Sequence, residues 1–137
     1  MNVLLLGNGG REHAIAWKLS QSSLLRTLHV APGNGGTRSI GTSADLDPMD
    51  FQSVERYIRK NQIDLVVVGP EAPLVNGIAD YLEDSKKVNV KVVGPRKAGA
   101  LLEGSKRFAK EFMHRHSIPT ARYGSFNNTQ LEKPCHS

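Results

Sequence analysis

Residues 3–14 read VLLLGNGGREHA, a short apolar run that leads directly into a glycine-rich turn and then into helix-forming residues. Because Gly7, Gly9 and Gly10 have no Cβ atom, the backbone can turn sharply here and can approach a ligand closely. The N–H groups that open the following helix stay available to an anion. This stretch therefore predicts a strand, a turn and a helix that together bind phosphate.

The stretch matches only part of the dinucleotide fingerprint G-x-G-x-x-G. That pattern would place a third glycine at position 12, where this chain has Glu12. A nicotinamide enzyme also usually carries an acidic residue about 20 residues beyond the glycines, where it binds the ribose hydroxyls. Residues 29–34 occupy that place with the sequence HVAPGN, which has no carboxylate. An NAD(P)-dependent oxidoreductase domain is therefore the alternative interpretation and the less favoured one.

Length and composition indicate one globular domain, with or without the start of another. The chain has 137 residues, of which 39% are hydrophobic. Its longest apolar runs, residues 3–6 and 65–68, are far shorter than the roughly 20 residues that span a bilayer. With no evident signal peptide and with Cys135 as the single cysteine, we expect a cytoplasmic protein without membrane partners.

The charge of the chain favours small anions as partners. The formal net charge is +5, but lysine and arginine are spread along the sequence and form no dense tract. We therefore expect phosphate esters rather than nucleic acid as ligands. The sequence carries no signal for an oligomeric state.

Strand-like runs alternate with helix-like runs, which predicts an α/β fold with an open parallel sheet of about five strands and helices on both faces. The expected strand order is 3-2-1-4-5. Strands are expected at residues 3–6, 27–31, 40–43, 64–68 and 90–93.

Two helices are predicted from caps and periodicity. Asp47 is the expected N-cap of one helix, with Pro48 at its first helical position. Leu74, Ile78 and Leu82 have i, i+4 spacing and predict a second helix that packs on the sheet.

A domain boundary is predicted just before Gly104, which divides the chain into residues 1–103 and 104–137. An amphipathic helix is expected from Ser105 to His116, followed by a strand over residues 120–126. The chain is thus expected to end just as a second domain begins.

Three loops are expected to form one crevice, because ligands of open parallel sheets bind at the carboxyl ends of the strands where the strand order reverses. They comprise residues 7–12, 32–36 and 69–73. Arg11 suits bidentate recognition of phosphate, although a surface ion pair is the alternative. Glu71 and Glu12 fit either a polar contact to a ligand or a role at a helix N-terminus.

The histidines and Cys135 suggest no further chemistry. His13 fits a helix residue packed against the sheet better than a catalyst. His114 and His116 are two residues apart on a helix, so they cannot face one metal ion. No metal site is predicted.

Four motifs stand in order along the chain. They are GNGGREHA at 7–14, PGN at 32–34, DLVVVGPEAPL at 64–74 and LEGSK at 102–106, and IPTA follows at 118–121. Together they closely resemble the glycinamide ribonucleotide synthetases, also called phosphoribosylamine–glycine ligases. The resemblance covers nearly the whole chain.

The resemblance implies an ATP-grasp ligase of de novo purine biosynthesis with ATP and Mg²⁺ (or Mn²⁺) as cofactors. In such an enzyme ATP converts glycine to an acyl phosphate, which the amine of 5-phosphoribosylamine attacks to give glycinamide ribonucleotide, ADP and phosphate. The N-terminal domain would be a Rossmann-like pre-ATP-grasp domain that supplies part of the phosphoribosyl site. The substrate-binding residues implied by this resemblance are Gly9, Gly10, Arg11, Glu12, Gly33, Asn34, Gly69, Pro70 and Glu71.

Within that set, the resemblance assigns Gly9, Gly10 and Arg11 to the phosphate, and Asn34 and Glu71 to the ribose or the amine. The part from residue 104 would be the first helix and strand of an incomplete ATP-grasp domain.

Lys106 resembles the lysine that ATP-grasp enzymes place near the nucleotide phosphates, with an exposed helix lysine as the alternative. The remaining ATP-grasp lobes are expected beyond Ser137. No catalytic residue, metal ligand or firmly bound cofactor is therefore assigned to this fragment, which is expected to be inactive alone.

Overall fold

The computed structural model describes residues 1–124. These residues belong to two compact units, of which the first comprises Met1–Ala100 and the second begins at Leu101.

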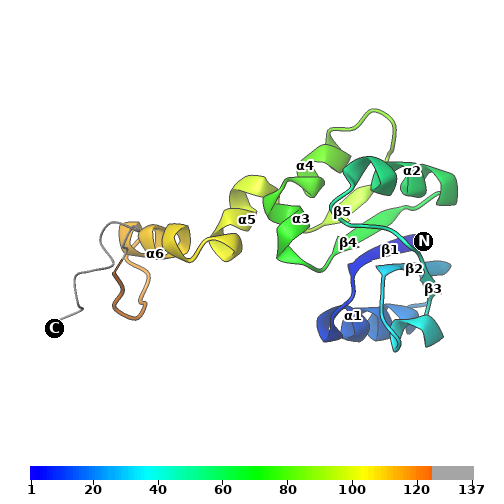
Figure 1. The fold of residues 1–137 in the computed structure, drawn as a ribbon, viewed down its shortest axis with the longest axis horizontal. Helices are drawn as coiled ribbons and strands as arrows, with labels where there is room; N and C mark the ends of the chain where they lie inside the picture. Colours follow the sequence, from blue (N-terminus) through cyan, green and yellow to red (C-terminus); the bar gives the residue numbers. More distant parts are fainter. Residues whose placement is uncertain (125–137) are drawn as a thin grey trace. The chain divides into compact units, whose positions relative to one another are not determined.

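The first unit is built on a parallel sheet of five strands (Figure 1). Its order, β3-β2-β1-β4-β5, confirms the predicted order, and β1 lies at the centre between β2 and β4. The third strand is two residues shorter than predicted, because the N–H groups of Ile40 and Gly41 bond to the carbonyl of Thr37 instead of a neighbouring strand. The strands are β1 (Asn2–Gly7), β2 (Thr27–Pro32), β3 (Thr42–Ser43), β4 (Leu65–Val68) and β5 (Lys91–Val93).

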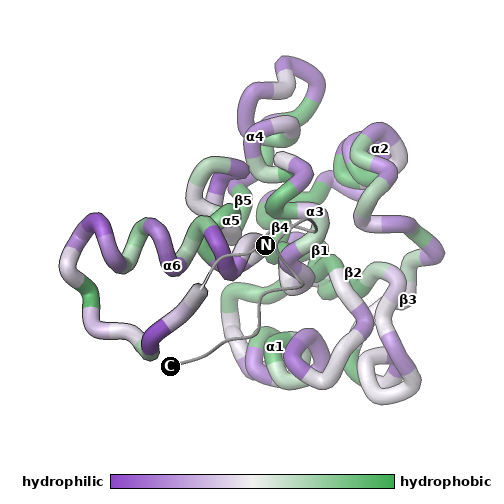
Figure 2. The backbone as a smooth tube through the Cα atoms, turned by 60° about the vertical axis from the view of Figure 1, so that its left-hand side comes forward, coloured by the Kyte–Doolittle hydropathy of each residue, from purple (hydrophilic) through white to green (hydrophobic). Residues whose placement is uncertain are grey.

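Helices cover both faces of the sheet, as predicted, and this explains the continuous apolar sequence of β1. Val3 and Leu5 pack in one buried cluster with Ala16 of α1 (Gly10–Ser20). Leu4 and Leu6 pack in the other cluster with residues of α2 (Phe51–Asn61), α3 (Glu71–Val75) and α4 (Ile78–Glu83). In Figure 2 the outer loops are mostly hydrophilic, whereas hydrophobic segments gather along the strands.

The start of α2 corrects the predicted helix cap. Asp50 is the N-cap, and its Oδ1 accepts the N–H of Ser53 at 3.0 Å. Asp47 belongs to the preceding turn, where its Oδ1 accepts the N–H of Met49 at 2.8 Å. The prediction of Asp47 as N-cap and Pro48 as first helical residue was wrong, because two aspartates three residues apart each cap a turn and only the second turn continues as a helix.

The predicted helix through Leu74, Ile78 and Leu82 is two short helices. Gly77 separates them with a φ of 92°, a left-handed conformation that ends one helix and starts the next. All three apolar side chains are nevertheless buried in the same cluster. The spacing predicted the buried side correctly and the continuity of the helix wrongly.

In the second unit, α6 (Lys106–Arg115) confirms the predicted amphipathic helix. Ser105 is its N-cap and accepts the N–H of Phe108 at 3.2 Å. The shorter helix α5 (Lys97–Gly104) precedes it and crosses the division between the units.

The strand predicted over residues 120–126 is absent from residues 120–124, and residues 125 and 126 lie outside the described part. Lys110 donates from Nζ to the Thr120 hydroxyl at 2.5 Å and to the Ala121 carbonyl at 3.3 Å. A strand needs a neighbouring strand to pair with, and this segment pairs with no other part of residues 1–124. Among those residues, no helix has the length and apolar character needed to cross a membrane.

Candidate functional site

The three predicted loops meet at the carboxyl edge of the sheet. Strands β2 and β4 flank β1, so the loops that follow these three strands are neighbours. The N–H of Gly33 donates to the carbonyl of Gly7 at 3.1 Å, and the N–H of Gly69 donates to the carbonyl of Leu6 at 3.0 Å. The backbone itself therefore ties the second and third loops to the end of β1.

Glu12 lies inside this group of loops rather than on its surface, with 4% of the residue exposed. Its Oε2 accepts the N–H of Gly9, the N-cap of α1, at 2.7 Å. A glutamate in the third helical position that bonds back to the N-cap is half of a capping box. A role at a helix N-terminus, one of the two that the sequence leaves open for Glu12, is thus present, and the spacing of Gly9 and Glu12 is its signal in the sequence.

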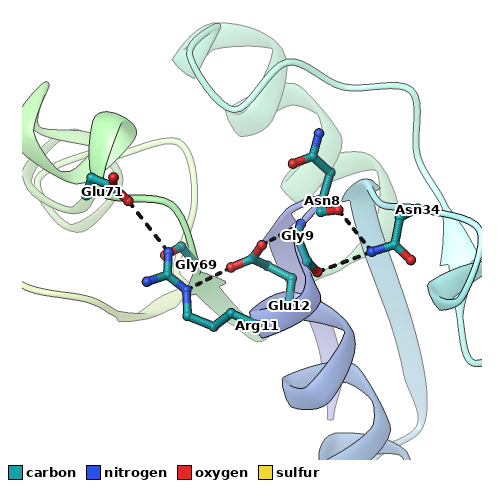
Figure 3. A network of polar contacts seen from close by, with 7 residues as sticks. All are labelled: Asn8, Gly9, Arg11, Glu12, Asn34, Gly69 and Glu71. Carbon is teal, nitrogen blue, oxygen red and sulfur yellow. Dashed lines mark hydrogen bonds and ion pairs between the residues drawn. The ribbon is translucent and has the colours of Figure 1, made fainter.

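Arg11 reaches from α1 to the loop that follows β4 (Figure 3). Its Nε donates to Oε1 of Glu12 at 3.1 Å, and its Nη2 donates to the carbonyl of Gly69. The same Nη2 lies 3.6 Å from Oε2 of Glu71. The side chains of Arg11 and Glu71 are 54% and 58% exposed, so both remain accessible to a solute.

Asn34 joins the second loop to the first (Figure 3). Its Nδ2 donates to the carbonyls of Asn8 and Gly9 at 2.9 and 3.2 Å. Its Oδ1 accepts the N–H groups of Gly36 and Thr37 at 2.9 and 3.0 Å. Both ends of the amide are therefore engaged with backbone, and in this structure the side chain fixes loop geometry.

The remaining predicted residues lie in the same loops. Gly33 has a φ of 72°, which glycine adopts without strain. Gly10 is the first residue of α1 and is exposed. Pro70 is the N-cap of α3, and Glu71 is the first residue of that helix.

Two further residues at the site have structural roles that the sequence does not indicate. Thr37 is fully buried, and its Oγ1 accepts the N–H of Asn34 at 2.8 Å. The ring of His13 lies against Gly36, where an added Cβ would come within 2.6 Å of its Nδ1. No sequence motif predicts such contacts, because they depend on how the loop folds back against the rest of the chain.

Lys106 belongs to the second unit, where it is the exposed first residue of α6. Within residues 1–124 no group of three or more His, Cys, Asp and Glu side chains is placed to hold a metal ion. What the first unit does provide is a helix N-terminus beside an exposed guanidinium, an arrangement suited to an anion.

Comparisons with known proteins agree on one family. The family model described as phosphoribosylglycinamide synthetase, N domain, matches residues 1–103. A phosphoribosylamine–glycine ligase from Mesorhizobium japonicum is 54% identical over 133 residues, which cover 97% of this chain and 31% of that protein. A trifunctional purine biosynthetic protein, adenosine-3, from Drosophila pseudoobscura pseudoobscura is 47% identical and is matched over 96% of this chain and 10% of its own length.

A crystal structure agrees with these sequence relatives. The phosphoribosylamine–glycine ligase of Thermotoga maritima superposes with a TM-score of 0.63 at 34% identity, over 89% of this chain and 26% of that one. The chain thus spans about a third or less of the length of the relatives that it matches. Because the family model covers three quarters of the sequence, the chain belongs to the family of phosphoribosylglycinamide synthetase N domains.

Proposed function

We propose that this chain is the substrate-binding N-terminal part of a phosphoribosylamine–glycine ligase. The whole enzyme would join glycine to 5-phosphoribosylamine with ATP and release glycinamide ribonucleotide, ADP and phosphate, in the cytoplasm. The observation that carries the proposal is the 54% identity to a ligase of that name across 97% of the chain. The meeting of the three loops at the carboxyl edge of the sheet supports it.

The phosphate of 5-phosphoribosylamine would lie at the N-terminus of α1, beside Arg11. The first N–H groups of a helix have no partner within it, and the helix dipole adds positive potential there. A guanidinium next to such a terminus can donate charge-assisted hydrogen bonds to phosphate. Glu71 lies next to Arg11 and is exposed, which supports a contact of its carboxylate with the ribose or amine of the same ligand.

The role of this unit in the reaction would be to orient the amine. Phosphate and ribose do not react, so the energy of binding them serves to hold the amine in position for attack on an acyl phosphate. ATP and Mg²⁺ would supply the activation of glycine. No residue of the first unit is assigned to that step.

The part of the chain from residue 104 onward, which lies within the second unit, would be the beginning of the ATP-grasp domain. Lys106 is proposed to approach the nucleotide phosphates in the whole enzyme. Its exposed position at the start of a helix is compatible with that role.

Calorimetric titration of the chain with ribose 5-phosphate, a stable stand-in for 5-phosphoribosylamine, tests the proposal. We expect binding to the native chain and a loss of about tenfold or more in Arg11→Ala, since hydrogen bonds to charged groups contribute about 1.5–3 kcal/mol. Arg59→Ala is the matched control. Arg59 is an exposed arginine in the last turn of α2, which leads into the start of β4 at the edge of the sheet opposite the three loops. Equal affinity of all three proteins, or binding of NADH without binding of ribose 5-phosphate, would overturn the proposal.

A further inference from the structure

The carboxylate of Glu12 is the buried centre of the site. Its side chain is 6% exposed, and each oxygen has a partner, the N–H of Gly9 for Oε2 and the Nε of Arg11 for Oε1. A buried carboxylate is costly unless it is paired and hydrogen-bonded. The protein therefore holds this charge in place with groups from its own chain.

Three glycines from two loops make room for this side chain. A Cβ at Gly7 would lie 2.5 Å from Cγ of Glu12, and one at Gly69 would lie 2.6 Å from the same atom. A Cβ at Gly9 would lie 2.9 Å from Oε2. All three values are below 3.0 Å, a separation that real Cβ atoms essentially never show. The turn after β1 and the loop after β4 are thus both shaped around Glu12.

Arg11 takes its orientation from the same carboxylate. Its Nε is bonded to a buried group, while the side chain as a whole is 54% exposed. Nη2 donates to the Gly69 carbonyl at the start of the loop after β4. Because the guanidinium is planar and rigid, bonds at Nε and Nη2 fix the orientation of the whole group.

We propose that Glu12 is a positioning residue of the phosphoribosyl site. Its carboxylate holds the turn after β1 against the loop after β4 and orients the guanidinium of Arg11 toward the substrate phosphate, without touching the substrate. This role replaces the direct substrate contact implied by the family resemblance. The assignment of Arg11 to the substrate phosphate rests on the proposed function, whereas the orientation of Arg11 by Glu12 does not.

Solvent exchange of the Arg11 Nε–H, measured by NMR on the ¹⁵N-labelled chain, tests the orientation without any ligand. Glu12→Gln keeps the shape of the side chain and removes its charge. We expect exchange in this variant to be about tenfold faster, because the ion pair with the guanidinium is lost and the amide must turn its NH2 group toward Gly9 N–H or Arg11 Nε–H, both of which are donors. The Nε–H of Arg59 serves as the internal control and should be unchanged. Equal exchange of Arg11 in both proteins would overturn the proposal.

A second variant covers the case in which Glu12→Gln does not fold. Glu12→Asp keeps the charge but is one methylene shorter, so it cannot reach the partners of both oxygens at once. We expect faster exchange of the Arg11 Nε–H there as well, in a protein whose circular dichroism is native. Native exchange rates in this folded variant would equally contradict the proposal.

Binding of ribose 5-phosphate then tests whether Glu12 acts through Arg11. Glu12→Gln should weaken binding about tenfold in the native background and less than about twofold in an Arg11→Ala background, as expected for coupled residues. Equal losses in both backgrounds would mean that Glu12 acts independently of Arg11 and would overturn the proposal. If the native chain binds no ribose 5-phosphate, the proposed function fails for this chain, and the exchange measurement still decides the role of Glu12.

Discussion

Glu12 changes the meaning of the glycine-rich turn in which it stands. Glycines in such a turn are usually explained by the approach of a ligand, and the sequence alone supports that explanation. In this structure Gly7, Gly9 and Gly69 first of all leave space for a side chain of the protein itself. Glu12 occupies the position at which the dinucleotide pattern has its third glycine. This departure from the pattern therefore provides the buried side chain around which the turn is shaped.

Gly69→Ala is predicted to destabilise the first unit. The added methyl would overlap the buried carboxylate of Glu12, and overpacking of this kind costs about 1–3 kcal/mol. In a unit of this size each 1 kcal/mol lowers the melting temperature by about 4–8 °C, which thermal unfolding followed by circular dichroism would detect.

Gly35→Ala is the control, because a Cβ at that position meets nothing within 4 Å. It should change the stability by less than about 0.5 kcal/mol. A Gly69→Ala protein that melts together with the native chain would show that Glu12 is not held as described.

At the scale of the elements, the central sheet could be predicted and the ends of the helices could not. The run Val3 to Leu6 is buried on both faces, and the run Leu65 to Val68 is buried on one face and partly buried on the other, so their apolar sequence marks them clearly. Helix ends depend on competing local hydrogen bonds. Asp47 and Asp50 each accept a backbone N–H in a turn, and only the folded chain distinguishes the turn that becomes a helix.

The site was predictable to the same extent. The meeting of three loops follows from parallel strand order alone, and it was predicted. The engagement of Asn34 with four backbone groups was not predicted, because it depends on how the loop folds back. For Glu12 the sequence left two roles open, and the spacing of Gly9 and Glu12 indicates the one at a helix N-terminus.

Strand β2 and helix α2 are joined by a contact that should make stability depend on pH. Nδ1 of His29 lies 2.8 Å from the hydroxyl of Tyr57, and the two rings meet edge to face. Burial lowers the pKa of His29 below its ordinary value of 6.5 and raises the pKa of Tyr57. Since the unfolded chain binds the proton more readily, the free energy of unfolding should fall as the pH drops below about 6.5.

Urea unfolding at pH 8 and pH 5 would measure this effect in the native chain and in His29→Gln. The native chain should lose more stability than the variant over this interval. A hydrogen bond from Ser85 is the main cause that lowers the pKa of Glu55 below its ordinary value of 4.5. The stability that this carboxylate contributes is therefore lost only at more acidic pH, below about 4.5. Equal losses in the two proteins would exclude His29 as the source.

At the scale of the whole molecule, the first unit holds the proposed binding site, and the described residues supply no metal-binding cluster. The chain spans 31% of the Mesorhizobium japonicum ligase. We therefore predict that the 137-residue chain, mixed with ATP, Mg²⁺, glycine and 5-phosphoribosylamine, releases no ADP above background, because phosphoryl transfer requires a positioned nucleotide and metal. The whole ligase from that organism is the positive control, and ADP release by the chain itself would refute the prediction.

The central claim is that the three loops at the carboxyl edge of the sheet form one site for a sugar phosphate. The most direct test is an NMR titration of the ¹⁵N-labelled chain with ribose 5-phosphate, with unphosphorylated ribose as control. We predict that the largest amide shifts occur in residues 7–12, 33–36 and 69–71, and that ribose produces much smaller ones. Shifts centred on another part of the first unit, such as the turn after α4 at residues 84–87, or equal shifts with ribose, would contradict the account.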